Sequence, residues 1–195
     1  MRNTYFYKFL GIIFLAVFLV PALHAEDKRT IPLDLYLIID GSSILKNSKS
    51  DTIAWINSQV VDRILTDGDK VTIWTAGDKA QLIFSDTISG EAGKKGIKDK
   101  LLEIDTGAKK ADFSGALKDV LSKVSQTAGD RGRLAYTMLI TGSAEGLEPV
   151  ITGDSRGLLR WFRSEKYERW QVLVVAPNIG KKVQQAAAGY MSSLR

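Results

Sequence analysis

The residues best placed to do chemistry come directly after a strongly apolar run near the start of the chain. Residues 33–44 read LDLYLIIDGSSI, and the run at 35–39 is typical of a strand buried on both faces. Asp40, Ser42 and Ser43 then bring a carboxylate and two hydroxyls to the end of that strand. Ligands of open α/β sheets bind outside the carboxyl ends of the strands, so this is the first candidate site. Oxygen ligands of this kind suit Mg²⁺, whose coordination shell waters can complete.

Two other polar loops are expected at the same edge of the sheet. Residues 109–117 read KKADFSGAL and contribute Asp112, while residues 139–143 read LITGS and contribute Ser143. Asp112 can also cap a helix that begins beside it. The loops together form a candidate binding surface.

Alternating strand and helix patterns must position these loops. The predicted strands are the run that ends at Asp40, a run with Val71, Ile73 and Trp74, and the segments 80–85, 134–141 and 170–176. The predicted helices cover about 50–65, 93–104, 112–126, 154–166 and 183–191, and residues 75–79 signal a hairpin. This order predicts an α/β fold, with a mostly parallel sheet, one antiparallel edge hairpin and helices on both faces.

The first residues are predicted to be an export signal. Arg2 and Lys8 flank the start of an apolar stretch at 9–20, and cleavage is expected after Ala25. An uncleaved membrane anchor is the alternative, and it would be the only membrane contact. Either way we expect an exported protein, in the periplasm or at the cell surface. The predicted organisation is a signal peptide at 1–25, a short leader at 26–32 and a single domain at 33–195.

Composition excludes several kinds of site. The chain has no cysteine, and its single histidine, His24, lies within the predicted signal. Ser-His-Asp catalysis, Cys-His catalysis and zinc sites built from histidine or thiolate are therefore excluded from the predicted domain. Without residues 1–25, 25 Lys and Arg stand against 22 Asp and Glu, a mildly basic balance that does not indicate nucleic-acid binding.

The chain resembles the von Willebrand factor type A (VWA) domains over about residues 31–180. The resemblance rests on residues 40–44 (DGSSI), 112–117 (DFSGAL) and 139–142 (LITG). It implies a Rossmann-like fold in which three loops form a metal-ion-dependent adhesion site. The cation of such a site keeps a coordination position for an acidic residue of a partner protein. In the family's pattern, the first loop reads Asp-x-Ser-x-Ser, the second supplies a Thr and the third an Asp.

This chain departs from that pattern at three ligand positions. Asp40 and Ser42 match it, but Ile44, Ala111 and Gly142 stand where the second Ser, the Thr and the third-loop Asp are expected. None of the three has a side-chain oxygen, so the resemblance implies a degenerate site. Asp40 and Ser42 remain as candidate metal ligands, and such a site would bind a cation weakly. Rearrangement could add Ser43, Asp112, Thr141 or Ser143.

Asp40 and Ser42 also have two interpretations without an adhesion site. They can be turn residues whose side chains bind backbone amides of the loop. Alternatively, Asp40 can be the nucleophile or acid–base group of a metal-assisted hydrolase or phosphotransferase that recruits Asp112 and Lys109 or Lys110. Nothing in the spacing requires that recruitment, so we expect no enzyme.

Basic residues form two further groups. Arg156, Arg160 and Arg163 have i, i+4, i+7 spacing, which aligns them on one helix face near Trp161, Tyr167 and Trp170. This is either a solvated face or a second docking face. The other group lies on the predicted helix at 93–104 and consists of Lys94, Lys95, Lys98 and Lys100.

The sequence as a whole predicts an exported, non-catalytic protein–protein interaction module of the VWA type that uses no cofactor. The partner is expected to contact Asp40, Ser42, Ser43, Asp112 and Ser143. The alternative is a weak, divalent-cation-dependent binding module that retains Asp40 and Ser42 as ligands.

Overall fold

The computed structural model describes residues 29–127, 132–142 and 170–175. The strands in these ranges are β1 (Leu33–Asp40), β2 (Lys70–Ala76), β3 (Ala80–Thr87), β4 (Leu134–Ile140) and β5 (Trp170–Val175). They form one five-stranded sheet in the order β3-β2-β1-β4-β5. β1 pairs in parallel with β2 and β4, β4 pairs in parallel with β5, and β3 lies antiparallel to β2. The predicted α/β fold with one antiparallel edge hairpin is confirmed.

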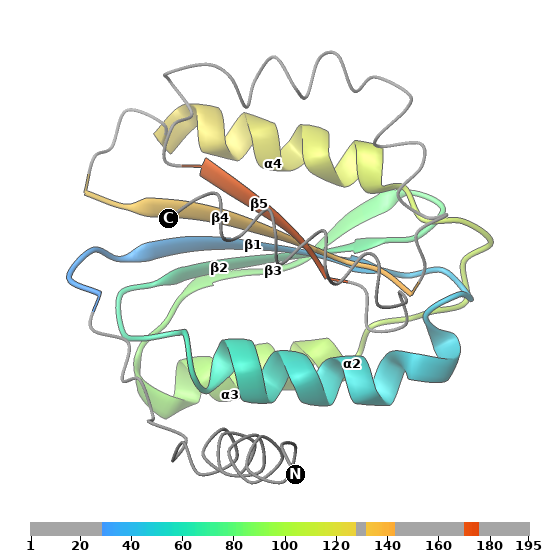
Figure 1. Ribbon diagram of the computed structural model, residues 1–195, viewed down its shortest axis with the longest axis horizontal. Coiled ribbons are helices and arrows are strands. Elements are labelled where there is room, and N and C mark those ends of the chain that lie inside the picture. The colour runs from blue at the N-terminus through green and yellow to red at the C-terminus, as the bar shows by residue number, and fades with distance from the viewer. Residues whose placement is uncertain (1–28, 128–131, 143–169, 176–195) are drawn as a thin grey trace, which may run out of the picture.

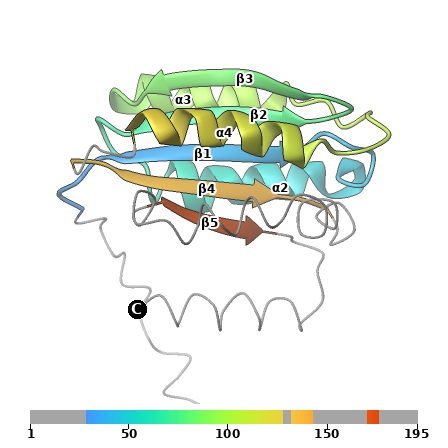
Figure 2. The ribbon, with the colours of Figure 1, turned by 90° about the horizontal axis from the view of Figure 1, so that it is seen from above.

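Helices cover both faces of the sheet. One face carries α2 (Lys49–Trp55), the π-helix η2 (Ile56–Val61) and α3 (Gly90–Leu102), and the opposite face carries α4 (Phe113–Thr127) (Figure 1). Seen from above, α4 lies over the middle of the sheet, and β3 and β5 are the two edge strands of the sheet (Figure 2). β1 is therefore the central strand, covered on both sides.

The central strand is divided between two cores by its period-two alternation. All eight residues of β1 are buried. Leu35, Leu37 and Ile39 belong to the core under α2 and α3, whereas Tyr36 and Ile38 belong to the core under α4. A strand that fills two cores needs apolar residues on both faces, which explains the uninterrupted apolar run in the sequence.

The predicted helix over 50–65 differs from the observed one in its second half. The α-helix ends at Trp55 and continues as η2, in which the amide of Asp62 donates to the carbonyl of Asn57 at 2.9 Å. Val60 and Val61 are the last two residues of this π-helix, and both are fully buried. Ile64, which follows the π-helix, is 37% exposed.

The other described helices agree with the sequence pattern, with shifted ends. α3 begins at Gly90, three residues before the predicted start at 93, and ends at Leu102. α4 buries its apolar stripe as expected, namely Phe113, Ala116, Leu117, Val120 and Val124. Within the described ranges, every helix is too short or too polar to span a bilayer.

Several predictions fall outside the described residues. These are the signal peptide at 1–25, residues 26–28 of the leader, the helices over 154–166 and 183–191, Ser143, and the arginine face of Arg156, Arg160 and Arg163.

Candidate functional site

Asp40 is the last residue of β1, and its carboxylate is fully buried. Oδ1 accepts a hydrogen bond from the amide of Ser42 at 2.8 Å. Oδ2 accepts one from the hydroxyl of Thr141 at 3.0 Å and one from the amide of Gly142 at 3.3 Å. Since Thr141 and Gly142 directly follow β4, the carboxylate fastens the loop after β1 to the loop after β4.

Backbone pairing joins the loop after β1 to two more segments. The amide of Gly41 donates to the carbonyl of Ala76 at 2.9 Å, at the end of β2. Ala108 donates to the carbonyl of Gly41 at 3.1 Å and accepts from the amide of Ser43 at 2.9 Å. A Cβ at Gly41 would lie 3.2–3.3 Å from backbone atoms of three other residues, so this close approach requires glycine. We call the segments 41–48, 77–79, 104–112 and 141–142 the carboxyl-end loops.

The two serines after Asp40 lie in different environments. Ser42 is fully buried, and its hydroxyl has no hydrogen-bond partner among the described residues. Ser43 is exposed. Of the residues predicted to contact a partner, Asp40 and Ser42 therefore lie beneath the surface, while Ser43 lies on it.

Asp112 is the N-terminal cap of α4. Its Oδ1 accepts from the amide of Gly115 at 2.9 Å, and its Oδ2 accepts from the amide of Ala80 at 3.3 Å. Its own amide donates to the carbonyl of Gly77 at 2.9 Å. A Cβ at Gly115 would collide with the Asp112 carboxylate, so glycine lets the cap close. Asp112 thus ties the β2–β3 turn to the start of α4.

Gly142 and Ile44, two of the residues that depart from the VWA ligand pattern, lie against each other. A Cβ added to Gly142 would be 2.9 Å from the carbonyl oxygen of Ile44. An aspartate at position 142 therefore has no room unless the loop after β1 moves. The Ile44 side chain is 43% exposed.

The side chains described at the end of β1 offer few ligands for a divalent cation. Asp40 is the one carboxylate at the end of β1, and three donors already occupy its oxygens. In the described ranges, no cluster of three or more Asp, Glu, His or Cys side chains is arranged to bind a metal. The unpartnered Ser42 hydroxyl is a neutral ligand and adds no charge to balance a dication. The side-chain oxygens that would complete the site are missing at Ile44, Ala111 and Gly142.

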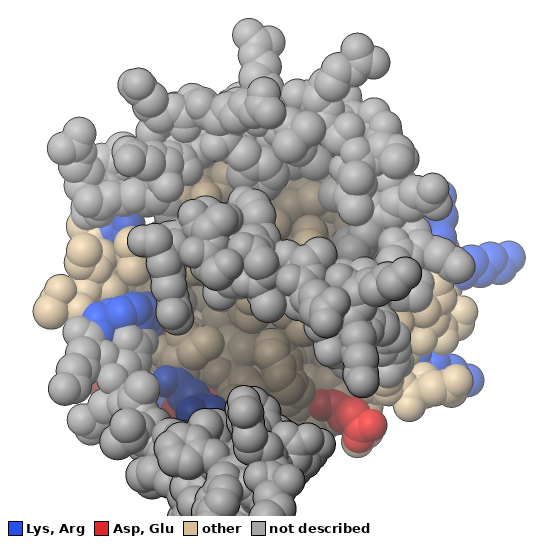
Figure 3. All heavy atoms as spheres, in the orientation of Figure 1, with Lys and Arg blue, Asp and Glu red and all other residues tan. Residues whose placement is uncertain are grey.

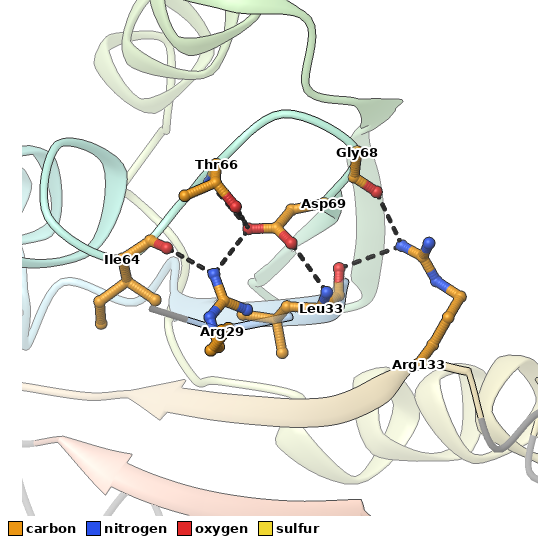
Figure 4. Close-up of polar contacts among 7 residues, drawn as sticks. All are labelled: Arg29, Leu33, Ile64, Thr66, Gly68, Asp69 and Arg133. Carbon is orange, nitrogen blue, oxygen red and sulfur yellow. Dashed lines mark hydrogen bonds and ion pairs between the residues drawn. The ribbon is translucent and has the colours of Figure 1, made fainter. Parts of the chain in front are cut away.

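A second buried polar cluster lies at the opposite end of the sheet, around the start of β1 (Figure 4). Asp69 is fully buried and accepts from the amide of Leu33 at 2.7 Å, the amide of Thr66 at 2.9 Å and the guanidinium of Arg29 at 2.9 Å. Arg133 donates to the carboxylate of Asp34 at 2.7 Å. We call Arg29, Asp34, Thr66, Asp69 and Arg133 the amino-end cluster.

The amino-end cluster also perturbs a neighbouring phenol. Burial raises the pKa of Tyr36 above its ordinary value, and the nearby Asp34 carboxylate raises it further; Arg133 acts in the opposite direction. Tyr36 therefore stays neutral at physiological pH.

The basic residues predicted on the helix at 93–104 are all paired. Each lysine of α3 forms an ion pair. The pairs are Lys94–Glu91, Lys95–Asp99, Lys98–Asp62 and Lys100–Glu103.

Sequence reasoning passed over lysines in the carboxyl-end loops. Lys46, Lys79, Lys109 and Lys110 are exposed, and no described carboxylate forms an ion pair with them. The sequence signal was available, since each lies in a loop that follows a strand or precedes α4. Only Lys109 and Lys110 drew notice, as candidates for catalysis.

The chain is distantly similar to several known proteins. No protein-family model matches the chain. An uncharacterized protein of Treponema pallidum (strain Nichols) is 24% identical over 175 residues, which are 85% of this chain and 77% of that protein. Proximal thread matrix protein 1 from the mussel byssus superposes with a TM-score of 0.53 at 16% identity, over 80% of this chain and 41% of that one.

A second solved structure matches equally well. The manganese-loaded TRAP protein of Plasmodium vivax superposes with a TM-score of 0.53 at 20% identity, over 81% of this chain and 63% of that one. This chain thus spans less than half of the mussel chain and less than two thirds of the Plasmodium chain. Together with the sheet order and the single antiparallel edge strand, these matches identify the fold as that of the VWA domains.

Proposed function

We propose that this protein is an exported, non-catalytic protein–protein interaction module that binds its partner without a metal ion. The observation that carries the proposal is the hydrogen bonding of Asp40. Its carboxylate is bonded to Ser42, Thr141 and Gly142, so the carboxyl-end loops are held in place by direct bonds. A surface that is preorganised in this way loses little entropy when a partner binds.

In this proposal the predicted site residues divide into supporting and contacting residues. Asp40 and Ser42 are buried and Asp112 caps α4, so these three support the loops from beneath. Ser43 is exposed and available for contact. Ser143 and the arginine face of Arg156, Arg160 and Arg163 lie outside the described residues and remain candidate contacts.

The chemistry of the carboxyl-end loops supports a non-catalytic role. Asp40 is buried and bonded on both oxygens, and Asp112 is engaged as a helix cap. A nucleophile or general base needs a reactive atom that substrate can reach, together with a partner group that activates it. Lys109 and Lys110 are exposed at the rim and form no hydrogen bond with either aspartate.

Weak, cation-dependent binding is the second candidate, and one observation favours it. The buried hydroxyl of Ser42 has no described partner, and Ser42 is one of the two residues that match the metal-site pattern. The TRAP protein of Plasmodium vivax, which has the same fold, is itself loaded with manganese.

Calorimetry with Mg²⁺, Mn²⁺ and Ca²⁺ on the exported protein separates the two candidates. We expect no binding heat at millimolar metal, and chemical cross-linking in the native compartment should capture the same protein partner with or without a chelator. Ser42→Ala is the matched variant, because it removes a metal ligand and breaks no described hydrogen bond. Metal binding that this variant abolishes, or partner capture that requires metal, would replace the first candidate with the second.

A further inference from the structure

Four lysines lie on three of the carboxyl-end loops. Lys46 follows β1, Lys79 lies in the β2–β3 turn, and Lys109 and Lys110 precede α4. All four belong to the carboxyl-end loops, and we call them the lysine rim. In the space-filling view, basic side chains project from the right-hand edge, the side toward which β1 points in Figure 1, and others lie on the left (Figure 3).

The rim is held by a rigid backbone although its side chains are free to move. The bonds between Gly41, Ser43 and Ala108 join the loop of Lys46 to that of Lys109. The bond from the amide of Asp112 to the carbonyl of Gly77 joins the loop of Lys110 to that of Lys79. The backbone positions of the four lysines relative to one another are therefore set by the fold.

The rim carries uncompensated positive charge at the surface. No rim lysine forms an ion pair with a described residue, whereas every lysine of the α3 group does. Asp78 and Asp105 are the exposed carboxylates of these loops, so four positive charges face two negative ones. The remaining carboxylates, Asp40 and Asp112, point inward to amides and a hydroxyl.

An apolar side chain is exposed on the same loops as the rim. Ile44 is 43% exposed, and its backbone is fixed against Gly142. An isoleucine exposed on loops that also carry these lysines offers a partner apolar surface to bury beside the charges it can pair with.

We propose that the lysine rim and Ile44 bind an acidic protein segment, whose carboxylates pair with the lysines and whose apolar side chain packs on Ile44. The inference rests on the proposed function and names the chemistry of the partner. The charge of the rim is complementary to such a segment and would also speed its association.

A protein segment fits this surface better than nucleic acid does. Asp78 and Asp105 interrupt the rim, and they would repel a continuous phosphate backbone. Among the described carboxyl-end loops there is neither an arginine nor an aromatic residue to bind or stack on bases. A peptide can place its carboxylates at the lysines and avoid the two aspartates.

The test uses a fluorescent, glutamate-rich peptide with a central leucine, titrated into the full exported protein. Two control ligands are used. One is the same peptide with glutamine in place of glutamate, and the other is an oligonucleotide with the same net charge as the acidic peptide. We expect the acidic peptide to bind and the glutamine peptide not to bind. Binding should weaken as ionic strength rises from about 0.01 M to about 0.15 M, because the Debye length falls from about 30 Å to about 8 Å.

Charge reversal of the rim provides the decisive variant. Lys109→Glu/Lys110→Glu should weaken peptide binding about tenfold or more, through loss of attraction and added repulsion. Lys70→Glu/Lys123→Glu is the matched control, since it changes net charge equally but lies at the start of β2 and near the end of α4. Ile44→Ser should also weaken binding while leaving its salt dependence intact.

Equal weakening by the two charge-reversal pairs, or tighter binding of the oligonucleotide, would overturn the proposal. Native-partner cross-linking with the same variants separates this failure from failure of the proposed function. If the rim variant still captures the partner, the interaction module stands and the rim is not its binding surface. If the wild-type protein captures no partner at all, the interaction module itself is wrong.

Discussion

Both ends of the central sheet bury carboxylates, but they satisfy them in different ways. At the amino end, the fully buried Asp69 pairs with Arg29 at 2.9 Å, and Asp34 pairs with Arg133 at 2.7 Å. At the carboxyl end, the equally buried Asp40 is bonded to a hydroxyl and two amides, and no described cation pairs with it. The amino end therefore neutralises its charges internally, while the carboxyl end leaves its cations on the surface.

The cations at the amino end of the sheet therefore have a structural role, whereas those at the carboxyl end are available to a binding partner. Arg133 also donates to the carbonyls of Leu33 and Gly68, so one side chain holds the starts of β1, β2 and β4 together (Figure 4). A lysine or arginine whose side chain is bonded within the protein is unavailable to a binding partner. The unpaired lysines of the carboxyl-end loops make no such bonds, which is why the candidate interaction surface lies at that end.

The largest effect is expected at the amino end, from Asp69→Ala. The change removes the carboxylate that accepts from Arg29 and from the amides of Leu33 and Thr66, and Arg29 keeps its bond to the carbonyl of Ile64. Removing one partner of a buried ion pair costs about 3–5 kcal/mol, measured as the free energy of unfolding in urea. Asp67→Ala, which removes a single exposed bond to Gly90 in the same turn, is the control and should cost about 1 kcal/mol. Equal losses for the two variants would contradict the distinction.

A smaller loss is expected at the carboxyl end from Asp40→Ala. Three donors lose their acceptor, but no buried cation is left unpaired, so the expected cost is about 2–3 kcal/mol. Thr141→Val, which removes one of the three donors, should cost about 1 kcal/mol. If Asp40→Ala were as stable as wild type, the carboxylate would not be what holds the loops. If metal raised the unfolding temperature of the wild type and not that of Asp40→Ala, this would also show that the carboxylate does not serve mainly to hold the loops.

Gly142→Ala tests the packing that leaves no room for a third-loop side chain. The added Cβ would come within 2.9 Å of the Ile44 carbonyl oxygen, and we expect a loss of about 1–3 kcal/mol in thermal unfolding. The matched control is Gly96→Ala within α3, where the nearest atom to the added Cβ is 3.9 Å away. That variant should gain about 0.5–1 kcal/mol through helix propensity. A stable Gly142→Ala protein would show that the loops can open enough to admit a ligand side chain.

The smallest effect concerns Tyr36 beside the amino-end cluster. Its pKa is raised in the folded state by burial and by Asp34, so above pH 10.0, the ordinary value, the unfolded chain releases a proton that the native protein retains. The stabilisation is complete below that pH and is lost as pH rises. Wild-type stability should fall more steeply than that of Tyr36→Phe above pH 10.0, by up to about 1.4 kcal/mol per pH unit. Parallel curves in urea titrations would place Tyr36 in a less buried environment.

Local sequence patterns predicted the helices and strands because the spacing of apolar residues within each segment shows which of its faces is buried. The apolar run before Asp40, the stripe that begins at Phe113 and the turn at Gly77 each show the required periodicity or turn chemistry within a few residues. The π-helix was not predictable in the same way. The pattern from Ile53 to Leu65 also fits a regular helix, and packing against the core selects the turn that buries Val61.

The candidate site was only half predictable for a similar reason. The sequence places Asp40, Ser42 and Ser43 at the end of a strand, and the missing oxygens at Ile44 and Gly142 are read directly from it. It does not show that Ser43 is exposed while Ser42 beside it is buried. Nor does it show that the charges of α3 are paired and those of the carboxyl-end loops are not.

The sequence by itself determined the α/β fold, the central strand and the carboxylate at its end, because periodicity and turn residues act over short distances. The tertiary structure alone decided what Asp40 does. Its acceptor oxygen meets the hydroxyl of Thr141, 101 residues further along the chain. That contact exists only because β1 and β4 pair in parallel, which brings their carboxyl ends to one edge of the sheet. The pairing of distant strands thus makes Asp40 a residue that holds the loops beneath the surface.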